Sequence, residues 1–265
     1  MPYFPQLKTG AAHQFPCTKR IVQRTIVNAS PNGPAVKLFD PGACRAEWEM
    51  ELSGLTIEEW SAIDELFDSV EGRLGTFGFL DPFGNLLKWS EDLSAAAWSK
   101  GAGIQLTAGI ADPSGGSRAT QVSNSAAGEQ SLSQAAPVPG GFQYCLSVYA
   151  RSDAVAAVRL FASSGGQTAS DVFALGSAWR RIELSTALPS QMETVVFGAA
   201  MAGGATADLF GFQAEGQIGA SAYKRTTTHS GAITNASFLD DELRLTTRAP
   251  DEYSCTVRIG ASQSL

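Results

Sequence analysis

The chain has 265 residues, of which 44% are hydrophobic, and a formal net charge of −7 from 19 basic and 26 acidic residues. This length suits two domains, each large enough to bury a core, and the scattered basic residues give no electrostatic reason to bind nucleic acid. No apolar stretch approaches the ~20 residues that cross a bilayer, and the N-terminus lacks a secretory signal, so we expect a soluble protein without membrane insertion.

Residues 1–55 predict a β-meander. Short strands are expected around 19–28, 35–39 and 45–53. Turn-forming residues separate them, at Ser30-Pro31-Asn32-Gly33-Pro34 and at Asp40-Pro41-Gly42.

The next segment predicts an α-helix over about 56–70. Thr56 and Glu59 have the spacing of a capping box, and Gly72 suits a left-handed C-terminal cap. Apolar residues between them recur at helical spacing: Trp60, Ile63, Leu66, Phe67 and Val70. A buried strand is expected to follow, formed by Leu74, Phe77, Phe79 and Leu80 and ended by Asp81-Pro82.

Residues 87–225 repeat short apolar alternations separated by polar or Gly-rich turns. This pattern is typical of an antiparallel β-sandwich of the jelly-roll or galactose-binding-like kind. The expected strands are 103–107, 117–124, 128–135, 142–151, 154–163, 169–175, 179–186, 193–200 and 206–215.

The C-terminal segment predicts two antiparallel strands, one around Phe238–Leu245 and one around Tyr253–Ile259. Because a lone hairpin is marginally stable in water, the pair must dock on a larger sheet, and we expect that sheet to be N-terminal. Residues 1–86 and 226–265 would then form one discontinuous β-sandwich domain with the helix packed on it, and 87–225 would be inserted. The alternative is a tandem arrangement with a small C-terminal hairpin.

Several stretches resemble bacteriophage minor tail and distal-tail proteins, in which a small β-sandwich carries a carbohydrate-binding-like β-sandwich. On the tail side these stretches are RTIVN (24–28), the strand around Trp48, LTIEEWSAIDELFDSVEGRLGTFGFLDP (55–82) and NLLKWSEDLSAAAW (85–98). On the module side they are YCLSVYARS (144–152), LGSAWRRIELS (175–185) and DLFGFQAEGQIGASAYKRTTT (208–228).

This resemblance implies a structural protein of a phage or phage-like tail tip, made in the host cytoplasm without a signal peptide and incorporated into the virion tail. The implied partners are other tail proteins, further copies of the chain in a homo-oligomeric ring, and a host surface glycan. Two other classes stay open. One is a stand-alone carbohydrate-binding adhesin, and the other is a glycan hydrolase.

Sugar binding requires flat aromatic faces and planar polar groups, which stack on sugar rings and pair with hydroxyls. The ligand-binding candidates are Trp89, Trp98, Tyr149, Arg151 and Trp179. Further aromatic and polar candidates are Tyr144, Arg159, Gln167, Arg180 and Gln213. The competing interpretation places Trp98 and Trp179 in the core.

Related sandwich modules hold a structural Ca²⁺ between their first and last strands. The resemblance places Glu91, Asp92 and Asp208 at the matching positions as oxygen donors, and solvated surface carboxylates are the alternative. No other cofactor is expected. His13 and His229 lie at opposite ends of the chain, outside any zinc-ligand spacing.

Cys17, Cys44, Cys145 and Cys255 are too far apart for a CxxC motif, so buried free thiols are expected, with a disulfide as the alternative. The paired carboxylates of the chain have plainer explanations as helix first-turn, polar-face or turn residues. No nucleophile elbow, Walker loop or Rossmann glycine pattern is present, and the sequence predicts no catalytic residue.

Overall fold

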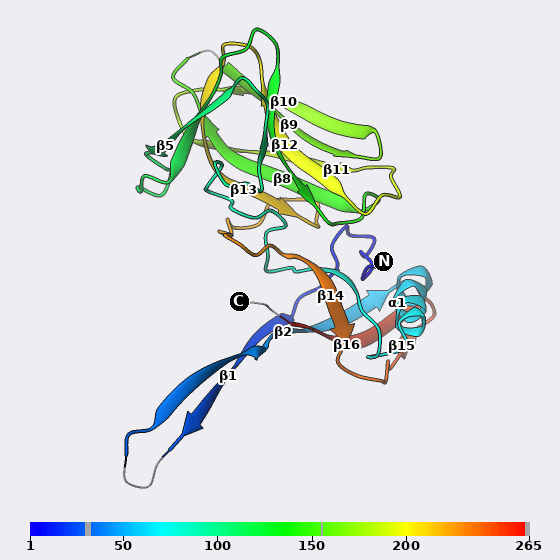
Figure 1. The fold of residues 1–265 in the computed structure, drawn as a ribbon. Coiled ribbons are helices and arrows are strands. Elements are labelled where there is room, and N and C mark those ends of the chain that lie inside the picture. Colours follow the sequence, from blue (N-terminus) through cyan, green and yellow to red (C-terminus); the bar gives the residue numbers. More distant parts are fainter. Residues whose placement is uncertain (30–32, 155, 263–265) are drawn as a thin grey trace. The chain divides into compact units, whose positions relative to one another are not determined.

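A computed structural model describes residues 1–29, 33–154 and 156–262 (Figure 1). The chain divides into two compact units, each assembled from separate segments. Unit 1 comprises residues 1–5, 13–79 and 233–265, and unit 2 comprises 6–12 and 80–232. From the sequence we expect one domain of residues 1–86 with 226–265 and a second domain of residues 87–225. That these two parts fold independently stays a prediction.

The helix of unit 1, α1, spans Ile57–Ser69. The capping box predicted from the sequence is present. Thr56 accepts a hydrogen bond from the Glu59 N–H, and the Glu59 carboxylate accepts one from the Thr56 N–H at 2.8 Å. The helix ends earlier than Gly72, because Val70 is the C-cap and Glu71 already has a positive φ of 55°.

The strands of unit 1 form one six-stranded sheet in the order β1-β2-β16-β14-β3, with β15 paired to β16. Their bounds are β1 Cys17–Asn28, β2 Val36–Leu55, β3 Phe77–Leu80, β14 Ala232–Phe238, β15 Thr246–Ala249 and β16 Glu252–Ser262. The C-terminal strand β16 pairs antiparallel with β2, from Tyr253 opposite Leu55 to Ser262 opposite Arg45.

Three local predictions for unit 1 were wrong. The strand expected around Phe238–Leu245 is not formed, because β14 ends at Phe238 and the next strand, β15, begins only at Thr246. The expected turn at Asp40-Pro41-Gly42 lies inside the continuous strand β2, where the β1 register shifts between Val22 and Arg24 and a bulge absorbs the extra residues. Leu74 is 76% exposed and precedes β3, because the chain is still turning after the helix at that point. The predicted turn residues 30–32 lie outside the described part of the chain.

Aromatic rings dominate the core of unit 1. Phe79 is fully buried, and its ring lies edge-on to Trp48 at 5.1 Å and to Phe4 at 5.9 Å between centroids. Phe238 brings β14 to the same core, with its ring 4.8 Å from Phe77. The helix contributes Phe67, whose ring lies 5.1 Å from Phe238.

Unit 2 is a β-sandwich of two five-stranded antiparallel sheets, ordered β10-β9-β12-β7-β4 and β11-β8-β13-β6-β5. The strands are β4 Ser99–Lys100, β5 Ile104–Ile110, β6 Ala119–Asn124, β7 Gln130–Ala136, β8 Gln143–Arg151, β9 Ala156–Ser164, β10 Gln167–Leu175, β11 Arg180–Ala187, β12 Val195–Met201 and β13 Thr206–Glu215. Each of the nine strands predicted for this region has a counterpart, and only the two-residue β4 was missed.

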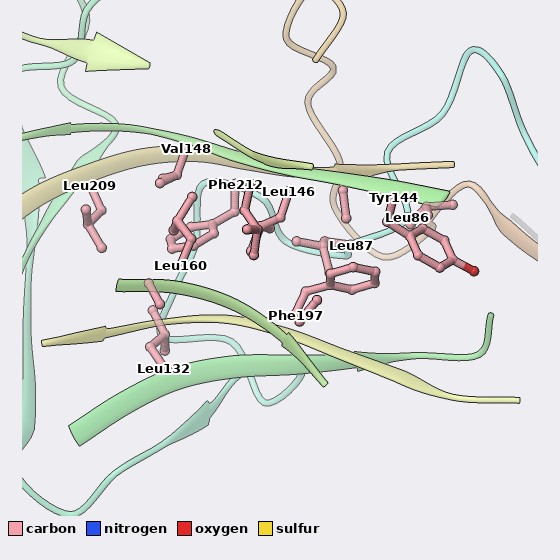
Figure 2. Close-up of a cluster of buried hydrophobic side chains, with 14 of the residues drawn as sticks. Leu86, Leu87, Leu132, Tyr144, Leu146, Val148, Leu160, Phe197, Leu209 and Phe212 are labelled. Atoms are coloured by element: carbon pink, nitrogen blue, oxygen red, sulfur yellow. The ribbon is translucent and has the colours of Figure 1, made fainter. Parts of the chain in front are cut away.

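The core of unit 2 lies between the two sheets (Figure 2). Alternate residues of each strand point into it, as the period of a β-strand requires. In β8 these residues are Tyr144, Leu146 and Val148, and they meet Leu160 and Phe197 of the opposite sheet.

The fold class predicted from the sequence is confirmed: a mainly β chain with one packed helix and a sandwich as its second unit. Among the described residues, no helix has the length and apolar character needed to cross a membrane. All four cysteines are free thiols, and three of them, Cys44, Cys145 and Cys255, are buried.

Candidate functional site

The candidate site lies on the outer face of the β11-β8-β13-β6-β5 sheet. Leu146, Val148 and Ala150 of β8 point into the core, so Tyr149 and Arg151 point to the opposite face. Both were predicted as ligand-binding residues. The strand alternation therefore places them together on a surface that the second sheet does not cover.

A cavity of about 380 Å³ opens on this face. It is lined by Glu91, Pro113, Ser114, Arg118, Tyr149, Phe210, Tyr223 and Arg225. Three aromatic rings, two guanidinium groups and one carboxylate thus converge on one half-open space. Its volume falls within the ~300–1,000 Å³ typical of small-molecule sites.

The aromatic rings form a contiguous series. Phe210 is only 4% exposed, and its ring centroid lies 6.1 Å from that of Tyr149 and 5.4 Å from that of Tyr223. Tyr149 and Phe210 are directly opposite one another in the β8–β13 register. The buried Phe210 therefore supports two half-exposed rings that are available to a ligand.

A β-bulge in β13 brings Tyr223 to the site. The register with β8 shifts between Phe210 and Gln213, and Gly211 within the bulge has a φ of +69°. A Cβ at this glycine would lie 2.9 Å from the Tyr223 ring. Glycine is therefore required twice here, by the backbone conformation and by the close approach of the ring.

Tyr223 and Arg225 belong to a segment that follows β13 and folds back over the outer face of the sheet; we call residues 216–226 the strap. Glu215, at the end of β13, anchors it by accepting hydrogen bonds from the Ser221 N–H at 2.9 Å and the Ser221 hydroxyl at 2.6 Å. The same carboxylate pairs with the Lys224 ammonium at 2.6 Å. Burial by itself would raise the pKa of Glu215, but these bonds outweigh it and hold that pKa below its usual value.

Glu91 lies between the two guanidinium groups of the cavity. Its Oε1 accepts hydrogen bonds from Arg118 Nη1 at 3.0 Å and from the Tyr223 hydroxyl at 3.3 Å. Its Oε2 lies 3.0 Å from Arg225 Nε, but the angle is not that of a hydrogen bond, so this buried oxygen has no hydrogen-bond donor among the described residues. Glu91 is therefore held between Arg118, Arg225 and Tyr223.

The loop before β6 holds Arg118 in place. Asp112 accepts hydrogen bonds from the Ser114 hydroxyl at 2.6 Å, from the Gly116 N–H at 3.1 Å and from Arg118 Nε at 3.2 Å. The hydrogen bond from the Ser114 hydroxyl is the main cause that lowers the pKa of Asp112. Burial raises this pKa, and hydrogen bonds from backbone N–H groups lower it further. Asp112 therefore stays ionised and keeps the Arg118 guanidinium fixed.

A second polar group adjoins the cavity on the same two strands. Arg151 Nε donates to Asp208 Oδ2 at 2.9 Å, and the Arg151 guanidinium lies 4.8 Å from the centre of the Trp179 ring. In the β8–β13 register the Arg151–Asp208 pair lies two residues along from Tyr149–Phe210. The predicted residues Tyr149, Arg151 and Trp179 thus share one face.

Other predicted residues lie elsewhere. Trp98 is 2% exposed, packs against the tilted ring of Phe212 in the core, and presents no face to a ligand. Trp89 is partly buried against the same core, and its carbonyl accepts a hydrogen bond from Trp98 Nε1. Tyr144 is fully buried, and Arg159 lies on the other sheet, paired with Glu129.

The three carboxylates expected to bind Ca²⁺ have separate surroundings. Glu91 contacts the two arginines of the cavity, Asp208 pairs with Arg151, and the exposed Asp92 accepts from the Ser94 N–H. No group of three or more acidic, histidine or cysteine side chains in the described ranges is arranged to hold a metal ion. Calcium binding stays a prediction.

Comparisons with known proteins identify no family for this chain. No family model matches it, and no curated protein does. Among solved structures, the chain is similar to a xylan-binding CBM22-1 domain from Paenibacillus barcinonensis Xyn10C, with 14% identity and a TM-score of 0.42 over 53% of this chain and 99% of that one.

It is similar as well to TmCBM61, solved in complex with β-1,4-galactotriose, with 17% identity and a TM-score of 0.38 over 49% of this chain and 97% of that one. A third similar structure is the enzymatically active domain of bacteriophage CBA120 tailspike protein 4, with 13% identity and a TM-score of 0.39 over 52% of this chain and 22% of that one. Similarities of this size assign neither a family nor a ligand.

Proposed function

We propose that unit 2 binds a carbohydrate, without catalysis, at the aromatic cavity on the outer face of its β11-β8-β13-β6-β5 sheet. The observation that carries this proposal is the convergence of Tyr149 and Tyr223 over Phe210, beside Arg118 and Glu91. Aromatic faces stack on the C–H surfaces of sugar rings, while planar polar groups pair with hydroxyls and set orientation.

The ligand class follows from the shape and polarity of this face. The cavity has a volume of about 380 Å³. Beside it on the same face of the sheet lie the Arg151–Asp208 pair and the Trp179 ring, so the surface available to a ligand is longer than one sugar ring. The charged groups are already paired with one another, which disfavours a strongly charged ligand. We therefore infer an oligosaccharide or polysaccharide segment that is largely neutral.

We propose that this site does not hydrolyse glycosides. Hydrolysis requires one carboxylic acid that carries a proton and a second carboxylate across the scissile bond. Asp112, whose pKa is lowered, is held ionised by its hydrogen bonds, and Glu91 is in contact with two guanidinium groups. A hydrolase is therefore the weaker alternative.

We further propose that unit 1 is an assembly domain of a phage or phage-like tail tip, with other tail proteins and further copies of the chain as partners. The resemblance of residues 24–28, of the strand around Trp48 and of residues 55–82 to tail proteins supports this role. The stand-alone adhesin is the alternative, and it would bind glycan without assembling. Gold-labelled antibody against residues 87–225 should mark the distal end of tails in electron micrographs, whereas antigen found free or on cells would favour the adhesin.

Glycan binding is tested on the full chain with a glycan array, followed by calorimetry on the best ligand. Tyr149→Ala should weaken binding about tenfold, which corresponds to ~1.4 kcal/mol and is the size of one aromatic stacking contact. Phe161→Ala is the matched control, because Phe161 is a half-exposed aromatic residue of β9 that lies under the Arg159 guanidinium on the other sheet.

Wild-type affinity in the Phe161 variant and reduced affinity in the Tyr149 variant would support the site. Absence of binding to every glycan would refute the binding function. Equal affinity in both variants would refute its location.

A further inference from the structure

The strap covers one side of the outer face of the β11-β8-β13-β6-β5 sheet. Arg181 of β11 donates a hydrogen bond to the Ser221 carbonyl of the strap, and Gln213 of β13 accepts one from the Lys224 N–H at 2.6 Å. Because β8 lies between β11 and β13 in the sheet, the strap crosses β8. Ser147 of β8 points outward, yet it is 0% exposed. The strap therefore closes the outer face at the level of Ser147.

A second barrier borders the cavity on the side of β6. The Arg118 guanidinium lies over the Phe210 ring, 5.3 Å from its centre. Asp112, whose side chain is fully buried, holds this guanidinium by accepting a hydrogen bond from its Nε at 3.2 Å. A glycan that rests on the aromatic floor of the cavity therefore meets a fixed side chain before it reaches β6.

Glu91 joins the two barriers. Its Oε1 lies 3.0 Å from Arg118 Nη1, and its Oε2 lies 3.0 Å from Arg225 Nε of the strap. The Tyr223 hydroxyl, also from the strap, donates to the same carboxylate at 3.3 Å. A continuous wall of polar side chains therefore runs from the loop before β6 to the strap.

The side of the cavity opposite the strap is accessible. Two residues beyond Tyr149 along β8, the Arg151 side chain is 26% exposed, and its guanidinium lies 4.8 Å from the centre of the half-buried Trp179 ring. The same step in the other direction along β8 leads to the covered Ser147. At ~3.3 Å per residue this step is roughly 7 Å, which is on the scale of one sugar residue. The outer face is therefore closed on one side of Tyr149 and open on the other.

This asymmetry limits which part of a glycan can enter the cavity. A sugar residue inside an extended glycan is bonded to a neighbour at each end, so its site must be open on two opposite sides. A terminal residue has one neighbour and needs one open side. The strap and the Arg118 barrier wall two adjacent sides of the cavity, so a straight path across it ends at one of them. The cavity therefore suits a terminal residue.

We propose that the aromatic cavity binds the terminal residue of a glycan, and that the next residues of the glycan lie over the Arg151–Asp208 pair beside Trp179. Gln121 of β6 donates to Asp208 at 3.3 Å, so this row presents planar polar groups from three strands. Such groups pair with sugar hydroxyls. The inference deepens the glycan-binding function proposed for unit 2, on which it rests, by naming the part of the glycan that is recognised.

The first test counts binding sites on a polysaccharide and needs no variant. The probes are neutral unbranched polysaccharides, each used as the intact polymer and after partial acid hydrolysis to shorter molecules. Shortening multiplies the glycan ends while the mass of polymer stays the same. We expect the amount of full-length protein bound at saturation, per gram of polymer, to rise in proportion to the number of glycan ends.

A second test locates the path by which the glycan leaves the cavity. Calorimetry or NMR titration gives affinities for the mono-, di- and trisaccharide of the polymer that binds. Tyr149→Ala should weaken all three by a similar factor of about ten, because Tyr149 contacts the terminal residue. Trp179→Ala should weaken the trisaccharide about tenfold and the monosaccharide much less, because Trp179 contacts the later residues. Phe161→Ala on the other sheet is the control, and circular dichroism melting curves establish that each variant is folded.

Three results would contradict the proposal at different points. Equal saturation per gram for intact and shortened polymer would show binding along the glycan and overturn recognition of its end, while the glycan-binding function would stand. A Trp179→Ala variant that loses equal affinity for the mono- and trisaccharide, or none, would overturn the assigned path. Absence of binding to every probe would refute the glycan-binding function and this inference with it.

Discussion

Replacing Glu215 with glutamine tests whether one buried carboxylate fixes the strap that carries Tyr223 and Arg225. The side chain of Glu215 is surrounded by donors: the Ser221 N–H and hydroxyl, the Gln213 amide at 2.7 Å and the Lys224 ammonium at 2.6 Å. Glutamine keeps the size of the side chain but removes its charge. The change therefore removes the charge of the anchor and turns one of its two acceptor oxygens into an amide donor.

The expected loss follows from the surroundings of Lys224. Removing one partner of a fully buried ion pair costs about 3–5 kcal/mol, because the other charge is left without compensation. Lys224 keeps a hydrogen bond to the Pro82 carbonyl at 2.9 Å, and its side chain is 23% exposed. We therefore expect Glu215→Gln to lower the unfolding free energy of unit 2 by about 2–3 kcal/mol at neutral pH.

The pH dependence of this loss has a defined sign. Because the pKa of Glu215 is lowered in the folded state, its carboxylate stabilises the fold above the unfolded-state value of about 4.3. That stabilisation is lost as the pH falls through the folded-state pKa. The difference between wild type and Glu215→Gln should therefore be full at neutral pH and shrink in acid.

Urea denaturation followed by tryptophan fluorescence, at neutral pH and in acid, measures both effects. Glu129→Gln is the control, because Glu129 is 49% exposed in its pair with Arg159 and should cost less than about 1 kcal/mol. A Glu215 variant as stable as wild type at neutral pH, or a difference that persists unchanged in acid, would contradict the reasoning. Glycan affinity should fall in the same variant, since the strap positions Tyr223.

Two further predictions concern burial. Phe79→Ala should lower the unfolding free energy by about 3–5 kcal/mol, because the ring is fully buried. As a control, Phe15→Ala, at an 87% exposed position, should change the unfolding free energy by less than about 0.5 kcal/mol. An unchanged melting midpoint for Phe79→Ala would show that the ring is not in the core. Burial raises the pKa of the Cys145 thiol to about 12 and that of Cys255 to about 11, so neither should react with iodoacetamide at neutral pH until the protein unfolds. Mass spectrometry of the labelled chain measures the modification of each thiol, with the half-buried Cys17 as the reference. Rapid modification of Cys145 under native conditions would contradict the prediction.

Sequence patterns predicted those parts of the fold that depend on neighbouring residues. The capping box of Thr56 and Glu59 defines the start of α1 through contacts within one turn. Alternation along β8 separates Tyr149 from the core residues on either side of it. The prediction of a turn at Asp40-Pro41-Gly42 was wrong, because pairing with β1 keeps β2 extended through a bulge. That pairing cannot be recognised from the local sequence.

Most of the residues that line the candidate site could not be predicted, for a related reason. Phe210 points outward at the bulge that Gly211 permits, and a glycine between two phenylalanines was the available signal of that bulge. Tyr223 reaches the site only because the strap folds back over the sheet. Arg118 meets Glu91, which is 27 residues away in the chain, and no spacing rule connects such positions.

The division of the chain into two interleaved units has a consequence for its synthesis on the ribosome. The backbone passes between the units four times, after Pro5, Ala12, Phe79 and Ala232. All of unit 2 has therefore been synthesised before β16, the middle strand of the unit 1 sheet, is made. Until then β2 has a neighbour on one side only, and the nascent chain holds an open sheet edge of the kind that promotes aggregation. Translation that stops after Ala232 would release a chain with all of unit 2 and an incomplete unit 1.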